Sequence, residues 1–379
     1  MTGPVALTLL ATTACGHSAP SGSELQLGTG PFAAAVPVRL TYSELSDEMA
    51  SLSPDGTLLV YSYERPTADG DRCLGIIPSS GGTRRVEQCE WRLDETAFSD
   101  GLDQAALTDD GRALFNRHRG MVGNLTSSVG ELMIGDLDAL HDARPILTLL
   151  DRPPGASAKW DDFREPQWLG DDTFLGLGAR RHLVNALCPK GCPSDIIRYP
   201  ALDTVVVGVE LARVRLTGGQ ATVTSIAQAP GAVTYALDRA SQVIYFVAQT
   251  PAPGDDAYRE PVADTLFRVS LGGGTPEALV GWPRPDRLPT EHVDGLAVAG
   301  GRVYLSLSFG IGTQLASEIV ELGPGGTLTR VATSPAWRWG RLRASPDGTA
   351  LIAESIERVS IAGSTRRTQT DLYRIELGP

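Results

Sequence analysis

The sequence predicts an all-β protein, a six-bladed β-propeller closed by pairing its N-terminal strand with its last blade. Three observations predict it: a turn-rich composition, a repeat of about 58 residues, and two chain ends that together make one further repeat. The 379 residues include 42 Gly and 26 Pro, too many turn-forming residues for a helical bundle. With 42% apolar residues, the chain is expected to bury a core and fold.

The repeat begins with a tight turn that leads into an apolar, β-prone run. Its clearest copies are the Ser-Pro-Asp-Gly turns at 53–56 and 345–348. In such a turn proline presets φ, aspartate accepts hydrogen bonds from its own backbone, and glycine takes a positive φ. Weaker copies lie between them, and turns aligned on Gly56 recur at positions 56, 111, 172, 240, 301 and 348.

Each unit also contains a second β-prone run, which in most units leads into a Gly-rich turn. In chain order, the runs after the first turns are 57–61, 112–115, 173–175, 241–247, 302–305 and 349–353. The second runs are 74–77, 131–134, 211–216, 265–271, 318–322 and 371–377. Regular short strands with turn signals and no amphipathic helix are typical of a propeller or a barrel.

The two ends of the chain favour a closed ring. The last turn lies 31 residues before the C-terminus and the first lies 21 residues after Ala35, which together approach one repeat. The strand 36–42 is therefore expected to complete the last blade and to hide two strand edges that would promote aggregation. This interpretation assigns one propeller domain to residues 36–379. The alternatives are a seven-bladed ring and a pair of β-sandwiches.

The N-terminal segment resembles an export signal with a lipid anchor. The ten-residue apolar run 5–14 matches the core of a signal peptide, about 7–15 residues long, and is too short for a membrane span of about 20. Two small residues before Cys15 resemble a bacterial lipobox, although Thr12 replaces the usual aliphatic residue and no Lys or Arg precedes the run. We therefore interpret 1–15 as a signal peptide with lipidation at Cys15, and 16–35 as a flexible tether. The alternatives are ordinary secretion and a disordered tail.

The expected location is the bacterial envelope, anchored as a lipoprotein in the periplasm or at the cell surface. An exported protein can form disulfides. Its four further cysteines are most simply paired as Cys73–Cys89 and Cys188–Cys192, and the first pair would close a loop of about 15 residues worth about 3 kcal/mol. The alternative is a zinc site that joins His182 to the second pair, but it offers three ligands where structural zinc usually has four.

The overall charge excludes one class of partner. The formal net charge is -12, whereas phosphate binding needs clustered Lys and Arg. We therefore expect no nucleic acid, and membrane contact only through the N-terminal lipid.

The turn, the two β-runs and the Gly-Gly turn of the first unit resemble the TolB-type (WD40-like) β-propeller repeat. LSPDGTLLVYSYERP…CLGIIPSSGGTRRV is similar to that repeat along most of its length, and RASPDGTALIAES…TDLYRIELGP is similar to its first three strands. The resemblance covers about residues 36–379 and implies the fold rather than a function. TolB carries a further N-terminal α/β domain that is not expected here, so its envelope partner is not implied. Peptidases join this repeat to a hydrolase domain, which is not expected either, and no Gly-x-Ser-x-Gly elbow occurs.

The candidate site is the mouth of the central channel, because the loop before each innermost strand of a propeller delivers side chains there. The candidate ligand-binding residues are Glu48, Asp103, Arg164, Glu165, His292, Asp294, Arg338 and Arg341. The carboxylates and the histidine could bind a divalent cation that activates water, and Arg338 and Arg341 could hold an acidic ligand. Apart from such a cation, no cofactor is predicted. The alternative is that these charges are solvated and pair with one another.

Two further features bear on recognition. Trp337 and Trp339 could stack on a sugar or a peptide, but core packing is the favoured interpretation for Trp339 and for Trp168. Three loops are predicted to be long, at 150–167, 178–200 and 250–263, and long loops on a rigid ring commonly carry recognition.

The leading hypothesis is a non-catalytic, envelope-tethered binding or scaffold propeller that recognises a protein or a small ligand through these loops and the channel mouth. The alternative is a propeller hydrolase or lyase acting on a sugar or lactone, with a metal or carboxylate and histidine site at the mouth. A third interpretation is a propeller that has lost its ligand.

Overall fold

The fold is that of a computed structural model, which describes much of the chain beyond the N-terminal segment. The described residues are 35–42, 46–64, 72–89, 97–121, 124–151, 160, 162–185, 202–250, 263–283, 291–311, 314–334, 337–360 and 366–378. The predicted signal peptide, Cys15, Cys188 and Cys192 lie outside them. Across the described part, no helix is long and apolar enough to cross a lipid bilayer.

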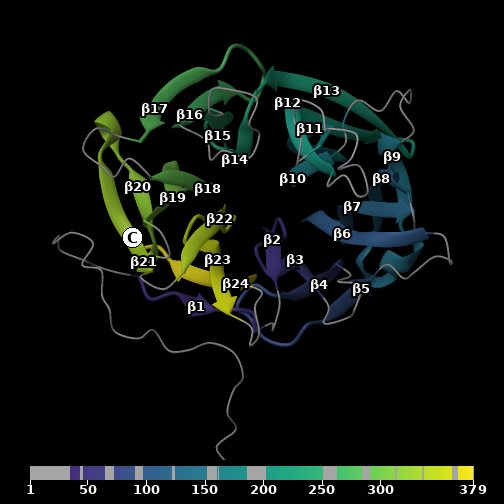
Figure 1. Ribbon diagram of the computed structural model, residues 1–379, viewed down its shortest axis with the longest axis horizontal. Coiled ribbons are helices and arrows are strands. Elements are labelled where there is room, and N and C mark those ends of the chain that lie inside the picture. Colours follow the sequence, from purple (N-terminus) through teal and green to yellow (C-terminus); the bar gives the residue numbers. More distant parts are fainter. Residues whose placement is uncertain are drawn as a thin grey trace, which may run out of the picture.

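Six four-stranded antiparallel sheets stand around a central axis as the blades of a propeller, which confirms the predicted fold class and blade number (Figure 1). Blade one consists of β2 (Asp47–Leu52), β3 (Leu58–Glu64), β4 (Arg72–Pro78) and β5 (Val86–Cys89). Blade two consists of β6 (Ala97–Leu107), β7 (Arg112–Met121), β8 (Asn124–Asp136) and β9 (Arg144–Asp151). Blade three consists of β10 (Asp162–Gly170), β11 (Thr173–Asn185), β12 (Leu202–Thr217) and β13 (Gln220–Gln228).

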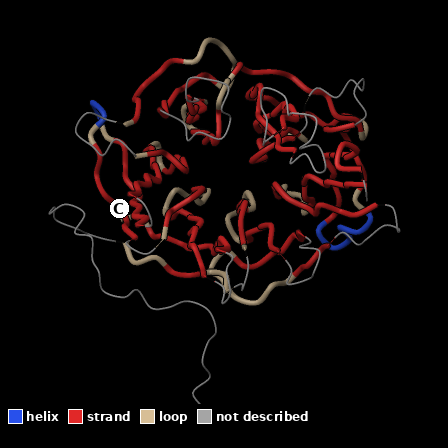
Figure 2. The backbone as a smooth tube through the Cα atoms, viewed as in Figure 1, coloured by secondary structure: helices blue, strands red, loops and turns tan. Residues whose placement is uncertain are grey.

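The other half of the ring repeats this arrangement. Blade four consists of β14 (Ala232–Asp238), β15 (Val243–Thr250), β16 (Ala263–Ser270) and β17 (Glu277–Trp282). Blade five consists of β18 (His292–Ala299), β19 (Arg302–Ile311), β20 (Gln314–Leu322) and β21 (Leu328–Ser334). Blade six consists of β22 (Arg338–Ala344), β23 (Ala350–Ser360), β24 (Arg366–Glu376) and β1 (Val38–Arg39). Figure 2 shows the two short 3-10 helices at the periphery, η1 (Leu137–Asp142) and η2 (Pro324–Gly326).

The hydrophobic core lies between the blades. The described apolar side chains form six buried clusters, and each cluster joins two neighbouring blades around the ring. Strands β3 and β4 are buried on both faces, since each inner part of a blade is covered by the blade before and the blade after it. Their sequences are accordingly almost continuous apolar runs, as expected for strands without a solvent face. The outer strand β13 instead alternates between exposed and partly buried residues.

The Ser-Pro-Asp-Gly turns adopt the same geometry in blades one and six. Ser53 Oγ donates to Asp55 Oδ1 at 2.5 Å, and Ser345 Oγ donates to Asp347 Oδ1 at the same distance. The glycine that follows has φ of 73° in blade one and 71° in blade six, in the left-handed region that favours glycine. The serine hydroxyl, helped by a backbone N–H and a threonine hydroxyl, lowers the pKa of Asp347 to about 2. The turn signal in the sequence therefore reports a specific hydrogen-bonded hairpin.

The N-terminal strand completes the last blade, as predicted, although it is shorter than the predicted 36–42. Strand β1 pairs antiparallel with β24, and Val38 lies opposite Arg374. The backbone N–H of Leu40 donates to Leu372 O at 2.7 Å, and Arg39 Nη2 lies 2.8 Å from Asp371 Oδ2. Both ends of the chain are thereby held in one sheet.

Two predictions about covalent and local structure have definite outcomes. The predicted disulfide between Cys73 and Cys89 is confirmed: the residues are opposed across β4 and β5 with their Cα atoms 4.4 Å apart. The predicted loop at 178–200 is wrong over its first part, because β11 continues to Asn185 and pairs there with Leu202 of β12. The chain from Arg181 to Asn185 extends this hairpin ladder instead of leaving the blade.

Candidate binding site in the central channel

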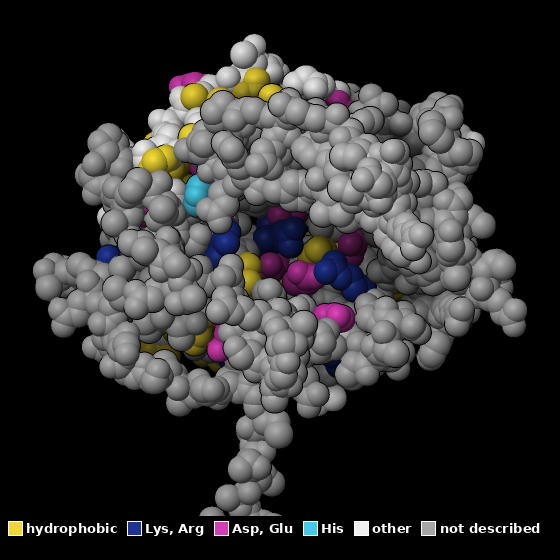
Figure 3. Space-filling view, in the orientation of Figure 1, with side chains coloured by type: hydrophobic (Ala, Val, Ile, Leu, Met, Phe, Trp, Pro, Cys, Tyr) yellow, Lys and Arg dark blue, Asp and Glu magenta, His cyan; other side chains and the backbone are white. Residues whose placement is uncertain are grey.

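The innermost strands carry the channel residues, and all six are irregular there. Each one has a register shift against its neighbour in the blade. At these bulges Met49, Gln104 and Glu165 have φ of 59°, 54° and 53°, a conformation uncommon for residues other than glycine. A bulge bends its strand and re-aims side chains. Figure 3 shows the result, a central hollow in which Arg or Lys and Asp or Glu side chains gather.

Glu165 of β10 is the centre of this charged cluster. Its side chain is almost fully buried, with 1% of its surface exposed. Arg341 Nε lies 3.0 Å from Oε1, Arg343 Nη2 lies 3.1 Å from Oε2, and Thr234 Oγ1 donates to Oε2 at 3.0 Å. Burial alone would raise the pKa of Glu165, but the two guanidinium groups outweigh it and hold the pKa below its usual range. Glu165 is therefore a buried carboxylate kept ionised by two arginines.

Arg341 of β22 joins two buried carboxylates. Besides Glu165, it approaches Glu354 of β23, with Nη1 3.8 Å from Oε2. Glu354 Oε1 also accepts a 2.6 Å hydrogen bond from the backbone N–H of Met49. Burial raises the pKa of Glu354 despite the attraction of Arg341. The Arg341 guanidinium thus joins blades three and six, and Glu354 extends the cluster to blade one.

Backbone groups of the channel are also satisfied by buried side chains from neighbouring blades. Gln104 Oε1 of blade two accepts from the backbone N–H of Glu165 at 2.8 Å. Tyr235 of blade four donates its hydroxyl to Glu165 O at 2.7 Å. Asn116 Nδ2 of blade two donates to Phe163 O of blade three at 3.0 Å. These bonds explain how the bulged backbone is held in place.

The other predicted site residues lie around this cluster in separate pairs. Glu48 Oε1 lies 2.6 Å from Arg72 Nη2, and Arg164 Nε donates to Asp162 at 2.7 Å. Asp294 of blade five forms an ion pair with Arg338 of blade six, with Nε donating to Oδ2 at 2.6 Å. Asp103 lies on β6 next to the bulge at Gln104.

His292 begins β18 and lies near a buried carboxylate. Its Nδ1 is 3.4 Å from Oδ2 of Asp264, a fully buried residue of β16. The same Oδ2 accepts from the backbone N–H of Val293 at 2.7 Å. His292 is therefore positioned between blades four and five, apart from the pairs of Glu165.

These positions bear on the predicted uses of the site. Arg338 and Arg341, proposed to hold an acidic ligand, each already contact carboxylates of the protein. Glu48, Glu165 and Asp294 pair with different arginines, and the described residues contain no group of three or more His, Cys, Asp or Glu placed to hold a metal ion. Among the described residues, the side chains proposed for a cation are thus not gathered into one group.

The tryptophans have the predicted core role. Trp339 is fully buried and Trp168 is 7% exposed. Trp337 packs edge-on against Trp339 and stacks on Tyr373, with ring centroids 5.7 Å and 5.6 Å apart. Such aromatic pairs stabilise a core beyond their buried area, so these rings hold blade six together.

Sequence reasoning missed several channel residues. Gln104, Thr234, Arg343 and Glu354 look like ordinary polar positions in strands, and only the ring places them at its axis. Glu354 carried a weak signal, because it interrupts the apolar run 350–353.

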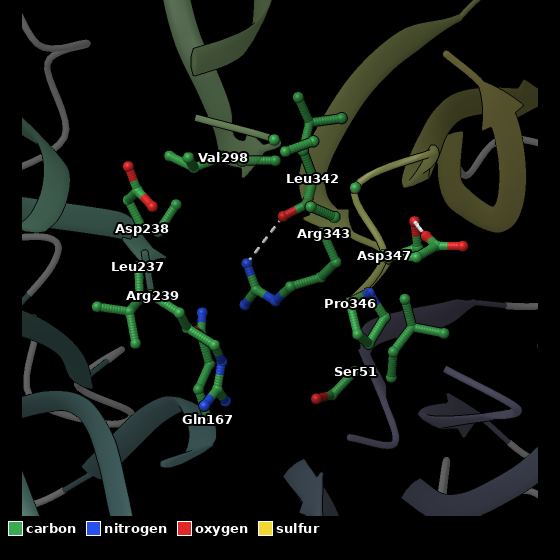
Figure 4. A pocket seen from close by; sticks show the side chains of 18 of the residues that line it. Ser51, Gln167, Leu237, Asp238, Arg239, Val298, Leu342, Arg343, Pro346 and Asp347 are labelled. Atoms are coloured by element: carbon green, nitrogen blue, oxygen red, sulfur yellow. Dashed lines mark hydrogen bonds between the residues drawn. The ribbon is translucent and has the colours of Figure 1, made fainter. Parts of the chain in front are cut away.

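Sequence reasoning also missed a cavity at the hairpin end of the innermost strands. It has a volume of about 530 Å³ and is lined by 51–54, 167–168, 235–240, 296–301 and 342–348, from five of the six blades. Figure 4 shows Arg239, Gln167 and Arg343 among the side chains that line it. Its walls are the repeat turns themselves, which were used to predict the fold and not a site.

Comparison with known proteins found similar solved structures at low sequence identity. No family profile matches the chain, and no curated relative was found. Among solved structures it is similar to TolB from Acinetobacter baumannii, with 10% identity, a TM-score of 0.45, and coverage of 86% of this chain and 64% of that one.

Two enzymes are similar at the same level. A prolyl endopeptidase has 14% identity and a TM-score of 0.42, and the match covers 86% of this chain but 40% of that one. An oligogalacturonate lyase in complex with manganese has 11% identity and a TM-score of 0.40, with 92% and 99% of the two chains covered. The chain thus spans less than half of the prolyl endopeptidase and nearly all of the lyase.

Proposed function

We propose that this chain is a non-catalytic binding propeller, exported and tethered to the bacterial envelope through Cys15. One observation carries the proposal: the carboxylate at the centre of the channel, Glu165, is already bound by Arg341 and Arg343. A carboxylate held ionised by two arginines supports the ring and is a poor proton donor or acceptor near neutral pH. In this proposal the ring is a rigid support, and a ligand binds at one of the two ends of its central channel.

Export is supported by the disulfide between Cys73 and Cys89, because disulfides persist mainly in oxidising compartments. Lipid anchoring rests on the sequence around Cys15. We expect wild-type protein in the membrane fraction and Cys15→Ser in the soluble fraction. A wild-type protein recovered in the soluble fraction would remove the anchoring claim.

Binding is tested with the tagged full-length chain crosslinked in its native envelope. We expect one stoichiometric envelope protein, or one small molecule detected by native mass spectrometry of the purified protein. The ligand, once recovered, is incubated with the protein and analysed again. An unchanged ligand is expected for a binding module, whereas its conversion to a product, or the absence of any stoichiometric ligand, would contradict the proposal.

A second candidate is a hydrolase or lyase acting on a sugar or lactone. One observation favours it: Asp264 lies within 3.4 Å of His292 Nδ1, and a carboxylate in that position can orient an imidazole as a general base. This candidate predicts turnover that is lost in His292→Ala and in Asp264→Asn. Turnover that survives both substitutions would eliminate it.

A further inference from the structure

The cavity at the hairpin end of the channel has the size and lining of a small-molecule site. Its volume of about 530 Å³ lies within the range of about 300–1,000 Å³ typical of ligand pockets. Apolar side chains form much of its wall, including Leu237, Val298, Leu342 and Pro346. This cavity is distinct from the channel mouth that the sequence indicated, because it is built from the turns that follow the innermost strands.

Two guanidinium groups enter this cavity from different blades. Arg239 comes from the hairpin turn of blade four, and Arg343 comes from β22 of blade six. Figure 4 shows Arg343 extending toward the part of the cavity where Arg239 and Gln167 are drawn. Both arginines also lie close enough to Tyr235 to affect its pKa: burial raises this pKa, while the charges of Arg343 and Arg239 both act to lower it.

Arg239 differs from the channel arginines because it lacks a carboxylate partner among the described residues. Its guanidinium donates to the backbone carbonyl of Trp168. Partial burial lowers the pKa of Arg239, which reflects the free-energy cost of withdrawing its charge from water. Arg341, Arg343 and Arg338 each contact an aspartate or glutamate instead. A guanidinium in a pocket, with one hydrogen bond to the part of the protein that the structure describes, is suited to a ligand oxyanion.

The two aspartates at the cavity are already bound within their own turns. Asp238 accepts from the backbone N–H of Ala240 at 3.0 Å and from Ser241 Oγ at 2.7 Å. Asp347 accepts from Ser345 Oγ at 2.5 Å and from the backbone N–H of its turn. Figure 4 shows both carboxylates at the margins of the view, away from the guanidinium group of Arg343. Neither aspartate supplies the missing partner of Arg239.

We propose that this cavity binds a small organic molecule with one oxyanion group, a carboxylate or a phosphate, and that Arg239 is the residue that recognises the anion. Arg343 adds a second positive charge while Glu165 holds its position. The apolar wall contacts the uncharged part of the ligand. This inference deepens the proposed binding function and rests on it, since it assigns the ligand class and the end of the ring that receives it.

The test is calorimetric titration of the purified chain with inorganic phosphate and, separately, with butyrate, which carries one carboxylate. We expect one equivalent of at least one of them to bind, and Arg239→Gln to weaken binding at least tenfold, about 1.4 kcal/mol. Arg239→Lys should bind with intermediate affinity, because it keeps the charge and loses the planar fork. Arg268→Gln is the matched control, since that exposed arginine of β16 pairs with Glu277 at 2.9 Å and lies outside the cavity.

Two results would overturn the inference: neither anion binds the wild type, or Arg239→Gln binds as tightly as the wild type. Thermal unfolding without ligand shows whether Arg239→Gln is folded. As a measurement that needs no variant, wild-type crystals soaked in phosphate should place the anion beside Arg239, and an anion found only elsewhere would also refute it. If crosslinking still captures a ligand from the envelope but neither anion binds in the titration, the assignment of the cavity is wrong and the proposed binding function stands.

Discussion

Arg341 of blade six contacts Glu165 of blade three across the axis of the ring, with Nε 3.0 Å from Oε1 at a sequence separation of 176. In a six-bladed ring these blades are opposite, and Figure 1 shows β10 and β22 on opposite sides of the centre. The pair therefore joins two blades that do not pack against each other. It stabilises the ring by linking opposite blades, and it fills the middle of the channel with paired opposite charges.

Removing the ion pair between Arg341 and Glu165 should lower the free energy of unfolding. Glu165→Gln leaves Arg341 and Arg343 facing a neutral amide, and breaking a buried pair typically costs about 3–5 kcal/mol. We expect a loss of about 3 kcal/mol in the free energy of unfolding, measured by urea denaturation. The exposed pair broken by Arg268→Gln should cost less than about 0.5 kcal/mol. Equal losses in the two variants would show that the cross-channel pair has no special role.

The disulfide should stabilise blade one. The Cys73–Cys89 bond closes a loop whose ends are 16 residues apart in sequence. Loop-entropy models give the closure of such a loop about 3 kcal/mol of stabilisation, which reduction removes. We expect the urea midpoint of Cys73→Ser/Cys89→Ser to fall by a corresponding amount. In the wild type without reductant, neither Cys73 nor Cys89 should react with an alkylating agent. Labelling of either cysteine in the folded, unreduced wild type would contradict the bond.

Asp47 should make stability depend on pH. Burial raises the pKa of Asp47 to about 7, with a further contribution from Asp371, and hydrogen bonding to Thr41 opposes it only in part. The folded state therefore retains a proton that the unfolded chain has lost between about pH 4 and pH 7, so stability falls as pH rises through that window. The loss should reach a few kcal/mol, because each pKa unit is worth about 1.4 kcal/mol.

Asp47→Asn is the test of this assignment, since the amide keeps the shape and cannot ionise. The variant should equal the wild type at or below about pH 4 and exceed it in stability by a margin that grows up to about pH 7, as measured by urea denaturation across the range. Identical pH profiles for both proteins would show that another group is responsible.

The glycine of the blade-six turn should be more sensitive than its equivalent in blade two. Gly348 and Gly111 have φ of 71° and 81°, so alanine at either position costs about 1–2 kcal/mol in backbone strain. A Cβ at Gly348 would also lie 2.8 Å from Gly300 N of the neighbouring blade, whereas Gly111 has nothing within 4 Å. Thermal unfolding should show Gly348→Ala as the less stable variant. The reverse order would mean that the contact between the turns of blades five and six is unimportant.

The repeat, the six blades, the closing strand and the Cys73–Cys89 pair were all predictable from the sequence. Their signals are local: the hydrogen bonds of the turn from Ser53 to Leu58 span five residues, and the blade is a hairpin stack whose period appears directly in the chain. The position of Trp339 in the core followed from its place before such a turn. The length of β11 was not predictable, because polar residues at 180–182 join the ladder only when β12 lies beside them.

The sequence alone thus determined the architecture, since turn chemistry, apolar runs and repeat spacing act over short distances. Only the tertiary structure decided which charges meet at the axis. Glu165 and Arg341 were both candidates, but their pairing, the burial of Glu354 and the contact of Arg239 with the Trp168 carbonyl depend on ring closure. Ring closure brings the six innermost strands, which are far apart in sequence, to one axis. Because the effective dielectric constant inside a protein is below that of water, an ion pair buried there contributes a larger electrostatic free energy than the same pair in water.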